Sequence, residues 1–520
     1  MTFQSEPFST KRQRQILLVA SLVCCLVMLD SNIVAVALPT IAQSLSASFS
    51  DIQWVITAYV LPFAALLMAA GSFADIAGRR RAVVLGQAIF AIASLLCGVA
   101  SSALVLNLSR ALQGVGASLL LTAALAVINN SFQGAARAQA YAFWGACIGI
   151  AITSGPIVGG IISSTLGWHW AFLINLPICG VLIAATFKVI PESRDPDARG
   201  VDWLGILLFT GGLFLLTWAV ISGNTLGWTS TAILLRLAAG VALLVAFGIA
   251  EHLQSQPMVD PRLLCTRDFA GSAAAMVGYA AAAQVMIFYL PLYLQNIYSF
   301  PPVIAGIGML PFALPMFIVP RVVVRLARNW SSKGILVLGL AVTTVANALL
   351  AMLTVSQVGY PGMALGMILA GIGAGLLNGE TAKAVQGTLP AHQSGMASGV
   401  SATLRFSALL IGVAALGAIL SAVTANNVHA ASALWGLDSK TAWEAAKQFA
   451  AGDAAGAIRG VSVEQHANAA ATLRQAFARG FSVTAWTASA IGLATGSLTL
   501  MLLRGDSLRG VGALHVVPGE

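Results

Sequence analysis

The stretch GSFADIAGRRR, residues 71–81, lies between two runs of apolar residues and decides how the rest of the chain is interpreted. Gly71 and Gly78 suit a tight turn, because glycine adopts backbone angles that other residues resist. Asp75 can pair with an arginine or lie against a helix N-terminus. The stretch ends in three arginines, Arg79, Arg80 and Arg81. Positive charge of this kind marks the cytoplasmic side of membrane proteins, so we expect a short cationic loop between two membrane-spanning helices.

The composition agrees with a membrane protein. Of the 520 residues, 58% are hydrophobic and only 9% are charged, whereas soluble domains carry about 25% charged residues. The formal net charge of +9 comes from basic residues scattered singly or in short loop clusters. This pattern is a topology signal, so the expected surroundings are a lipid bilayer and not a nucleic acid. The 6 cysteines show no metal-ligand spacing, and we expect no metal site and no cofactor.

Membrane-length apolar segments repeat along the chain. A helix needs roughly 20 apolar residues to cross the hydrocarbon core. This criterion predicts fourteen spans, near 16–38, 54–74, 82–100, 103–128, 139–162, 170–190, 203–222, 231–250, 270–294, 303–320, 334–355, 361–386, 397–422 and 482–503.

Positive charge predicts the topology. Loops rich in lysine and arginine, such as 79–81, 188–199 and 321–333, alternate with loops almost free of them. An even number of spans then places both termini in the cytoplasm. The N-terminal charges resemble those of a signal peptide, but the apolar segment is too long and contains Asp30, so we expect an uncleaved first helix. The predicted location is the bacterial cytoplasmic (inner) membrane.

Two polar stretches divide the chain. PESRDPDARGVD, residues 191–202, is rich in helix breakers and follows the sixth span as a linker would. A second polar stretch, 424–479, separates the last two spans on the outer side, and its segment TAWEAAKQFAA suggests short helices at the membrane surface. We therefore predict an N-terminal six-helix bundle, a linker with two extra spans, and a C-terminal six-helix bundle, at 1–190, 191–268 and 269–520.

The loop at 71–81 resembles the loop that joins the second and third helices in transporters of the major facilitator superfamily. The division into six, two and six spans resembles the fourteen-helix drug:proton antiporters, the EmrB/QacA-like branch. Four further stretches carry the resemblance: LDSNIVAVALP (29–39), RALQGVGA (110–117), SGPIVGG (154–160) and GWHWAFLINLP (167–177). The resemblance implies an all-helical fold of two six-helix bundles with two additional helices between them.

Asp30 and Arg110 are the first candidates for proton coupling. A charge at mid-helix costs about 2.5–3.5 kcal/mol on insertion scales, and burial favours the neutral acid, so Asp30 can gain and lose a proton as its surroundings change. The alternative is a carboxylate permanently paired with an arginine for helix packing. The family resemblance implicates Arg110 in proton transfer, and its alternative is an arginine that binds carbonyls near a helix end.

Glu380 is a further candidate in the C-terminal half. It stands three residues before Lys383, so the two lie on one helix face and can neutralise each other. The other interpretation makes Glu380 a second proton or cation site, with Arg405 from the next span as its partner.

Small residues in the fifth span predict close helix packing. They are Gly155, Pro156, Gly159 and Gly160. Small residues four apart let helices cross closely, and the proline removes a backbone donor and bends the helix. The resemblance to the antiporter motif implies that this helix lies between the two halves and limits proton leak.

Aromatic residues are the remaining candidates. Most are expected to pack or to lie at the membrane interface, but Trp54, Tyr59 and Tyr289 could stack on a planar or cationic substrate. We add Arg405 to this predicted substrate cavity.

The sequence favours a proton-coupled secondary exporter of lipophilic, cationic drugs or biocides that works by alternating access. Its partners would be the small-molecule substrate and protons; whether a periplasmic adaptor and an outer-membrane channel extend the path is left open. No nucleotide-binding GxxxxGK[ST] motif is present, and no nucleophile and base are paired in a span, so an enzyme is not expected. The alternative is a dedicated exporter of an endogenous metabolite, siderophore or peptide antibiotic.

Overall fold

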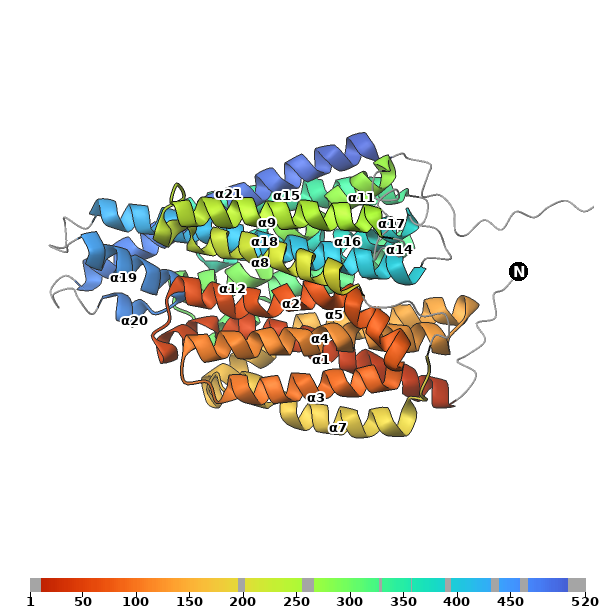
Figure 1. Cartoon of the computed structure of the whole chain (residues 1–520). Helices are drawn as coiled ribbons and strands as arrows, with labels where there is room; N and C mark the ends of the chain where they lie inside the picture. The colour runs from red at the N-terminus through yellow and green to blue at the C-terminus, as the bar shows by residue number, and fades with distance from the viewer. Residues whose placement is uncertain are drawn as a thin grey trace, which may run out of the picture.

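The computed structural model describes residues 11–194, 202–254, 266–326, 330–356, 358–388, 394–431, 439–458 and 466–503. These residues form helices that run side by side along one direction (Figure 1). Fourteen of the helical segments are long and apolar enough to cross a membrane. The predicted all-helical membrane fold and its number of spans are therefore confirmed.

The N-terminal half is built from the first seven helices. They are α1 (Lys11–Leu45), α2 (Phe49–Ala77), α3 (Arg79–Gly98), α4 (Ala103–Ser131), α5 (Gly134–Thr165), α6 (Trp170–Leu173) and α7 (Asn175–Val189). Helix α4 packs against α2 and α3, and α1 packs against α5. Ser48 begins α2 with a capping box, in which its hydroxyl accepts from the Asp51 N–H and Asp51 accepts from the Ser48 N–H. This reciprocal cap satisfies two backbone donors at the helix start.

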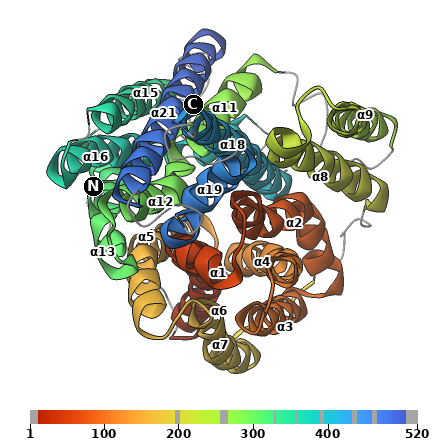
Figure 2. The same cartoon turned by 90° about the vertical axis from the view of Figure 1, so that its left-hand side faces the viewer.

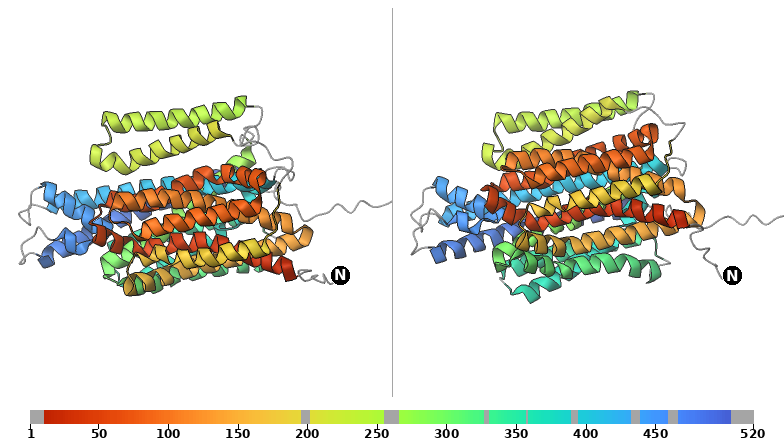
Figure 3. Two further views of the ribbon diagram at one scale, coloured as in Figure 1. Left: turned by 60° about the horizontal axis from the view of Figure 1, so that its bottom comes forward. Right: turned by 90° about the horizontal axis from the view of Figure 1, so that it is seen from below.

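Two additional helices lie on the periphery of the bundle. Helices α8 (Trp203–Leu226) and α9 (Thr231–Leu253) form a hairpin on one side of the other helices (Figure 3). Helix α8 packs against both α2 and α18 (Ser394–Ala431), where the two halves meet. The Asn224 amide donates to the Ala418 carbonyl of α18 at 2.6 Å. The hairpin therefore covers one seam between the halves.

The C-terminal half contains more interrupted helices. Its elements besides α18 are α11 (Arg267–Gly278), the π-helix η1 (Tyr279–Gln284), α12 (Met286–Tyr298), α13 (Pro302–Gly308), α14 (Leu310–Leu326), α15 (Ser332–Val355), α16 (Tyr360–Leu377), α17 (Glu380–Gly387), α19 (Ser439–Ala451), α20 (Ala454–Ala457) and α21 (His466–Leu502). The break between α13 and α14 falls at Met309, two residues before Pro311, and a proline has no backbone N–H to donate to the carbonyl one turn earlier. A π-helix is rare and often marks a functional position.

The predicted loop at 71–81 is much shorter than expected. Helix α2 continues to Ala77 and α3 begins at Arg79, so Gly71 lies inside a helix and its expected turn is wrong. Only Gly78 stands between the helices, with a φ of 114°. Glycine adopts this conformation without the steric cost that a side chain would bring.

The polar stretch 424–479 is also more helical than predicted. Helix α18 continues to Ala431 and α21 begins at His466, so both ends of the expected loop belong to long helices. The predicted short helix at TAWEAAKQFAA is confirmed as α19. It does not lie freely at a surface, because Phe449 is only 2% exposed. The predicted division at 190 and 268 falls beside the end of α7 and the start of α11; as a division into separate units it stays a prediction.

The two ends of the bundle differ. We call the end that carries the Gly78 turn the Gly78 end and the opposite end, covered by α19 and α20, the α19 end (Figure 1). The distribution of positive charge predicts that the Gly78 end faces the cytoplasm. At the α19 end the halves meet through α1 with α12, and through α5 with α13. The bundle is therefore closed between these helices at the α19 end.

Candidate functional site

Asp30 lies at the centre of a buried polar cluster in the N-terminal half. Its side chain, in the middle of α1, is 0% exposed. One carboxylate oxygen, Oδ2, accepts from the Arg110 guanidinium at 2.7 Å. The other, Oδ1, accepts from the Gln113 amide at 2.9 Å and from the Asn175 amide at 2.7 Å. Three donors from α4 and α7 thus surround one carboxylate of α1.

Arg110 of α4 is as deeply buried as its partner, at 1% exposed. Its Nη1 also donates to the Gln113 side-chain oxygen at 2.6 Å, and its Nε donates to the Val55 carbonyl of α2 at 3.1 Å. The guanidinium lies 4.1 Å from the centroid of the Tyr59 ring, a distance typical of a cation–π interaction. Arg110 thus binds both an acid and a backbone carbonyl, and its part in proton transfer stays a prediction.

Two amides and one hydroxyl of this cluster were missed by the sequence analysis. Gln113 and Asn175 also donate to the Ser94 hydroxyl of α3, at 2.9 and 3.2 Å. Gln113 stands three residues after Arg110, one turn further along the same helix face, and this spacing could have identified it. Ser94 and Asn175 carry no such local signal, because they lie on other helices. We call Asp30, Arg110, Gln113, Asn175 and Ser94 the N-terminal centre.

The N-terminal centre gives the Asp30 carboxylate one cationic and two amide donors in this conformation. Hydrogen bonds and a cation at this distance stabilise the charged carboxylate and offset its burial. A bound proton would compete with these donors for the carboxylate oxygens. The arrangement therefore fits both a permanent packing pair and a proton site that is exposed in another conformation.

Glu380 is separate from Arg405. It begins α17, where it pairs with Lys383 at 3.0 Å and accepts a hydrogen bond from Ser332 of α15. The Lys383 side chain is 67% exposed. The structure thus places Glu380 in the self-neutralised pair that the spacing allowed, and the alternative pairing with Arg405 is not formed.

Arg405 of α18 forms a different cluster with neutral partners. Its Nε donates to the Gln284 side-chain oxygen at 2.9 Å, and its Nη2 donates to the Tyr279 hydroxyl at 3.1 Å. The Tyr279 hydroxyl in turn donates to the Asn378 side-chain oxygen at 2.9 Å. Both Tyr279 and Gln284 belong to the π-helix η1, which sequence periodicity did not indicate. We call Arg405, Gln284, Tyr279 and Asn378 the C-terminal centre.

Asp75 and the arginines after Gly78 form two sets of contacts. Asp75 accepts from Arg79, one turn later, at 2.9 and 3.1 Å. Arg80 donates its backbone N–H to the Glu192 carboxylate at 3.1 Å, and its side chain lies 3.8 Å from the same group. Arg81 approaches that carboxylate to 3.7 Å.

Glu192 thus places a negative charge at the start of α3, where the first N–H groups lack helical partners. A side chain at position 78 would collide with it, because a Cβ there would lie 2.5 Å from Glu192 Oε1. Glu192 belongs to the stretch predicted as a linker, and its contact with α3 was not predicted. It is one of four acids in residues 191–202 and lies more than a hundred positions from these arginines, so it carries no local signal.

The glycines of α5 make the close approaches expected from their spacing. A Cβ at Gly155 would lie 2.4 Å from Asn32 Cβ of α1, and one at Gly159 would lie 2.7 Å from the Ile33 carbonyl. On the other face, a Cβ at Gly160 would lie 2.4 Å from the Pro302 carbonyl of the C-terminal half. The approach is equally close from the other helix, because a Cβ at Gly306 of α13 would collide with the Pro156 carbonyl of α5. Helix α5 is therefore wedged between α1 and α13.

The four residues predicted for a substrate cavity have separate surroundings. Trp54 packs on Phe214 of α8, with ring centroids 6.1 Å apart. Tyr59 belongs with Arg110, and Arg405 belongs to the C-terminal centre. Tyr289 is buried and donates to the Val413 carbonyl of α18. These contacts do not bring the four side chains together in the wall of one cavity.

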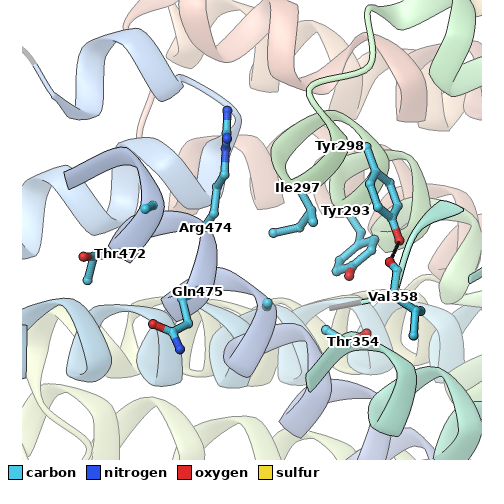
Figure 4. A pocket seen from close by; sticks show the side chains of 10 residues that line it. Tyr293, Ile297, Tyr298, Thr354, Val358, Thr472, Arg474 and Gln475 are labelled. Atoms are coloured by element: carbon cyan, nitrogen blue, oxygen red, sulfur yellow. Dashed lines mark hydrogen bonds between the residues drawn. The ribbon is translucent and has the colours of Figure 1, made fainter. Parts of the chain in front are cut away.

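A pocket of about 580 Å³ lies elsewhere, at the α19 end of the C-terminal half (Figure 4). Its lining residues are Tyr293, Ile297, Tyr298, Thr354, Val358, Ala471, Thr472, Arg474, Gln475 and Ala478. Arg474 donates to the Ser299 hydroxyl at 3.0 Å, and Tyr298 donates to the Val358 carbonyl at 2.9 Å. The pocket shares no residue with either centre, and we do not assign it to substrate.

Comparisons with known proteins identify the family. The family model of the Major Facilitator Superfamily matches residues 20–413. The chain is 33% identical to the multidrug resistance protein Stp of Mycobacterium tuberculosis over 402 residues, which cover 76% of this chain and 74% of that protein. It is 29% identical to the tetracenomycin C resistance and export protein of Streptomyces glaucescens over 398 residues, again 76% and 74% of the two chains.

A solved structure shows the same fold. It is a bacterial homologue of the human lysosomal transporter Spinster, which aligns with a TM-score of 0.61 over 96% of this chain and 100% of its own, at 15% identity. With drug and antibiotic exporters among its relatives and fourteen membrane-length helices, the chain is a multi-pass transporter that belongs to the major facilitator superfamily, in its fourteen-helix drug-exporting branch.

Proposed function

We propose that the protein is a proton-coupled antiporter that exports lipophilic compounds by alternating access, with Asp30 as the proton carrier. The observation that carries this proposal is the N-terminal centre, where a carboxylate buried at mid-membrane depends on donors from two other helices. Buried ionisable residues in membrane helices are costly and tend to be functional. The N-terminal centre and the α5 interface together supply the means of coupling.

The coupling path runs along α1. Asn32 and Ile33, two and three residues after Asp30, are in close contact with the α5 glycines. Helix α5 contacts α13 of the other half through Gly160. Movement between the halves at this interface therefore reaches α1 within one turn of Asp30. If α1 shifts against α4 and α7, the carboxylate loses donors and its neutral form is favoured by burial.

A transport cycle follows from this change. Asp30 would take up a proton from one side when its donors have withdrawn and release it to the other side when they return. Substrate would cross in the opposite direction during the exchange of conformations. Arg110 would stay charged throughout and stabilise the anion after proton release.

The charge of the substrate is a separate question. The embedded acid favoured a cation, but in this conformation Arg110 neutralises Asp30, and Arg405 adds positive charge. The apolar composition supports a lipophilic substrate but does not favour either charge state. The test should include one cationic and one uncharged dye.

The test is efflux from proteoliposomes under an imposed pH gradient. We expect the native protein to move ethidium or an uncharged lipophilic dye in a gradient-dependent way, and Asp30→Asn to abolish this movement while dye binding persists. Asp268→Asn is a matched control, because it makes the same chemical change in the first turn of α11, outside the N-terminal centre. Gradient-driven efflux that survives in Asp30→Asn would exclude Asp30 as the proton carrier.

A dedicated exporter of one endogenous compound is the second candidate. It is favoured by relatives named for single antibiotics, such as the cephamycin export protein of Amycolatopsis lactamdurans. A deletion strain separates the two candidates. Unchanged tolerance of dyes and biocides, with one compound missing from the culture medium, would support the dedicated exporter.

A further inference from the structure

The helix α19 lies over the middle of the bundle at its end, between α1, α12 and α18 (Figure 2). It follows α18 in the chain and packs along it. Its ring Phe449 also contacts Phe477 of α21, with centroids 6.0 Å apart. The helix is thus attached to the C-terminal half but reaches the N-terminal half.

The C-terminus of α19 receives one amide from each half. The last carbonyls of a helix lack partners within the helix. Asn296 of α12, in the C-terminal half, donates to the Phe449 carbonyl at 3.0 Å. Gln43 of α1, in the N-terminal half, donates to the Gly452 carbonyl at 2.8 Å.

The fit between α19 and α1 is also close in the backbone. Gly452 has a φ of 101° and ends the helix with a bond from the Asp453 N–H to the Gln448 carbonyl at 2.9 Å. This is the Schellman pattern, which glycine favours. A Cβ at Gly452 would lie 2.4 Å from Pro39 Cβ. The end of α19 is therefore shaped to lie against α1.

A third amide joins the two halves about one turn before Pro39 on α1. Gln295, the neighbour of Asn296, donates to the Val36 carbonyl of α1 at 3.1 Å. Helices α1, α12 and α19 are thus tied in pairs by three side-chain amides, each bound to a backbone carbonyl. Separation of α1 from α12 would prevent α19 from keeping both of its amide bonds.

We propose that α19 forms a latch that stabilises the conformation closed at the α19 end. Because α19 packs along α18, opening would carry it away with the C-terminal half and break the bond from Gln43. The bond from Asn296 lies within the C-terminal half and holds the end of α19 where Gln43 can reach it, so the latch needs both bonds. The latch would then set the ratio of closed to open molecules independently of proton binding at Asp30. This inference does not depend on the proposed proton coupling, because its readout is a distance and not transport.

The test measures opening at the α19 end by double electron–electron resonance on the full-length protein. Nitroxide labels are placed at Ser101 and Ser356, exposed positions near the ends of α3 and α15 in opposite halves. All variants share a background in which the six native cysteines are replaced. We expect Gln43→Ala and Asn296→Ala each to raise the ratio of open to closed molecules about five-fold, the effect of one lost hydrogen bond. Gln475→Ala, a glutamine truncated at the same end but outside the latch, should leave the ratio unchanged.

The double variant distinguishes a latch from two unrelated contacts. A latch holds the halves together only while both bonds are made, so Gln43→Ala combined with Asn296→Ala should open little more than either alone. Multiplied effects, or an unchanged distance distribution in both single variants, would overturn the proposal. Gln43→Glu keeps the size of the side chain and places an acceptor against the Gly452 carbonyl; it should open the protein even if the alanine variant folds poorly.

Discussion

The two polar centres of the molecule differ in net charge and in the partners of their arginines. The N-terminal centre pairs one acid with one arginine, both almost completely buried. The C-terminal centre contains Arg405, whose hydrogen-bond partners among the described residues are the neutral Gln284 and Tyr279. Arg405 is also only partly buried.

This difference separates two kinds of role. A carboxylate can exchange a proton, whereas an arginine stays charged under all physiological conditions. The N-terminal centre can therefore carry protons, and the C-terminal centre supplies a fixed positive charge. The N-terminal centre has no net charge and the C-terminal centre has one positive charge, so the two centres should respond differently when one partner is removed.

The largest loss in the free energy of unfolding is expected for Arg110→Gln, in the N-terminal centre. Removing one partner of a buried ion pair leaves the other charge uncompensated and costs about 3–5 kcal/mol. We expect a loss of that order in the free energy of unfolding, measured by thermal or denaturant unfolding in detergent. Asp30 would be left with two neutral amide donors.

The double variant sharpens this prediction. Asp30→Asn combined with Arg110→Gln removes both charges, so it should be more stable than Arg110→Gln alone. If the losses of the two single variants simply add, the pair does not interact energetically as its 2.7 Å distance implies.

A smaller difference is expected when a neutral donor is removed. Asn175→Ala deletes a hydrogen bond to a charged carboxylate, which contributes about 1.5–3 kcal/mol, whereas Asn378→Ala deletes an acceptor for a neutral hydroxyl, worth about 1 kcal/mol. The two variants are matched, since each truncates one asparagine at the edge of a centre. Equal losses in the free energy of unfolding would show that the charge of Asp30 does not strengthen its hydrogen bonds.

Much of the N-terminal centre could be predicted from the sequence, and most of the C-terminal centre could not. Asp30 and Arg110 are conspicuous because charges are rare in apolar spans. Arg405 was noticed for the same reason, but Glu380, its suggested partner in one of the two interpretations, pairs with Lys383. Glu380 is the only acid in the neighbouring span, yet it lies at the helix end beside Lys383. Sequence spacing finds partners one turn apart and does not find those on other helices.

The contacts at the two ends of the bundle show the same limit of sequence spacing. The Asp75–Arg79 contact joins residues one helical turn apart and was among the expected alternatives. The contact of Glu192 with the start of α3, and the contacts of Gln43 and Asn296 with α19, join residues more than a hundred positions apart. Neutral amides are common in any sequence, so only the fold shows that these particular ones meet.

The smallest effect is expected for Tyr279→Phe. The change removes a hydroxyl that donates to Asn378 and accepts from Arg405, but it keeps the ring, whose centroid lies 4.9 Å from the guanidinium. Arg405 would retain Gln284, and its partial exposure lets solvent replace the lost partner, so the free energy of unfolding should fall by about 1 kcal/mol or less. Gradient-driven efflux should persist in the proteoliposome assay, because no proton carrier is altered. Loss of gradient dependence in Tyr279→Phe, at normal dye binding, would give the C-terminal centre a part in proton movement and end the division of roles between the two halves.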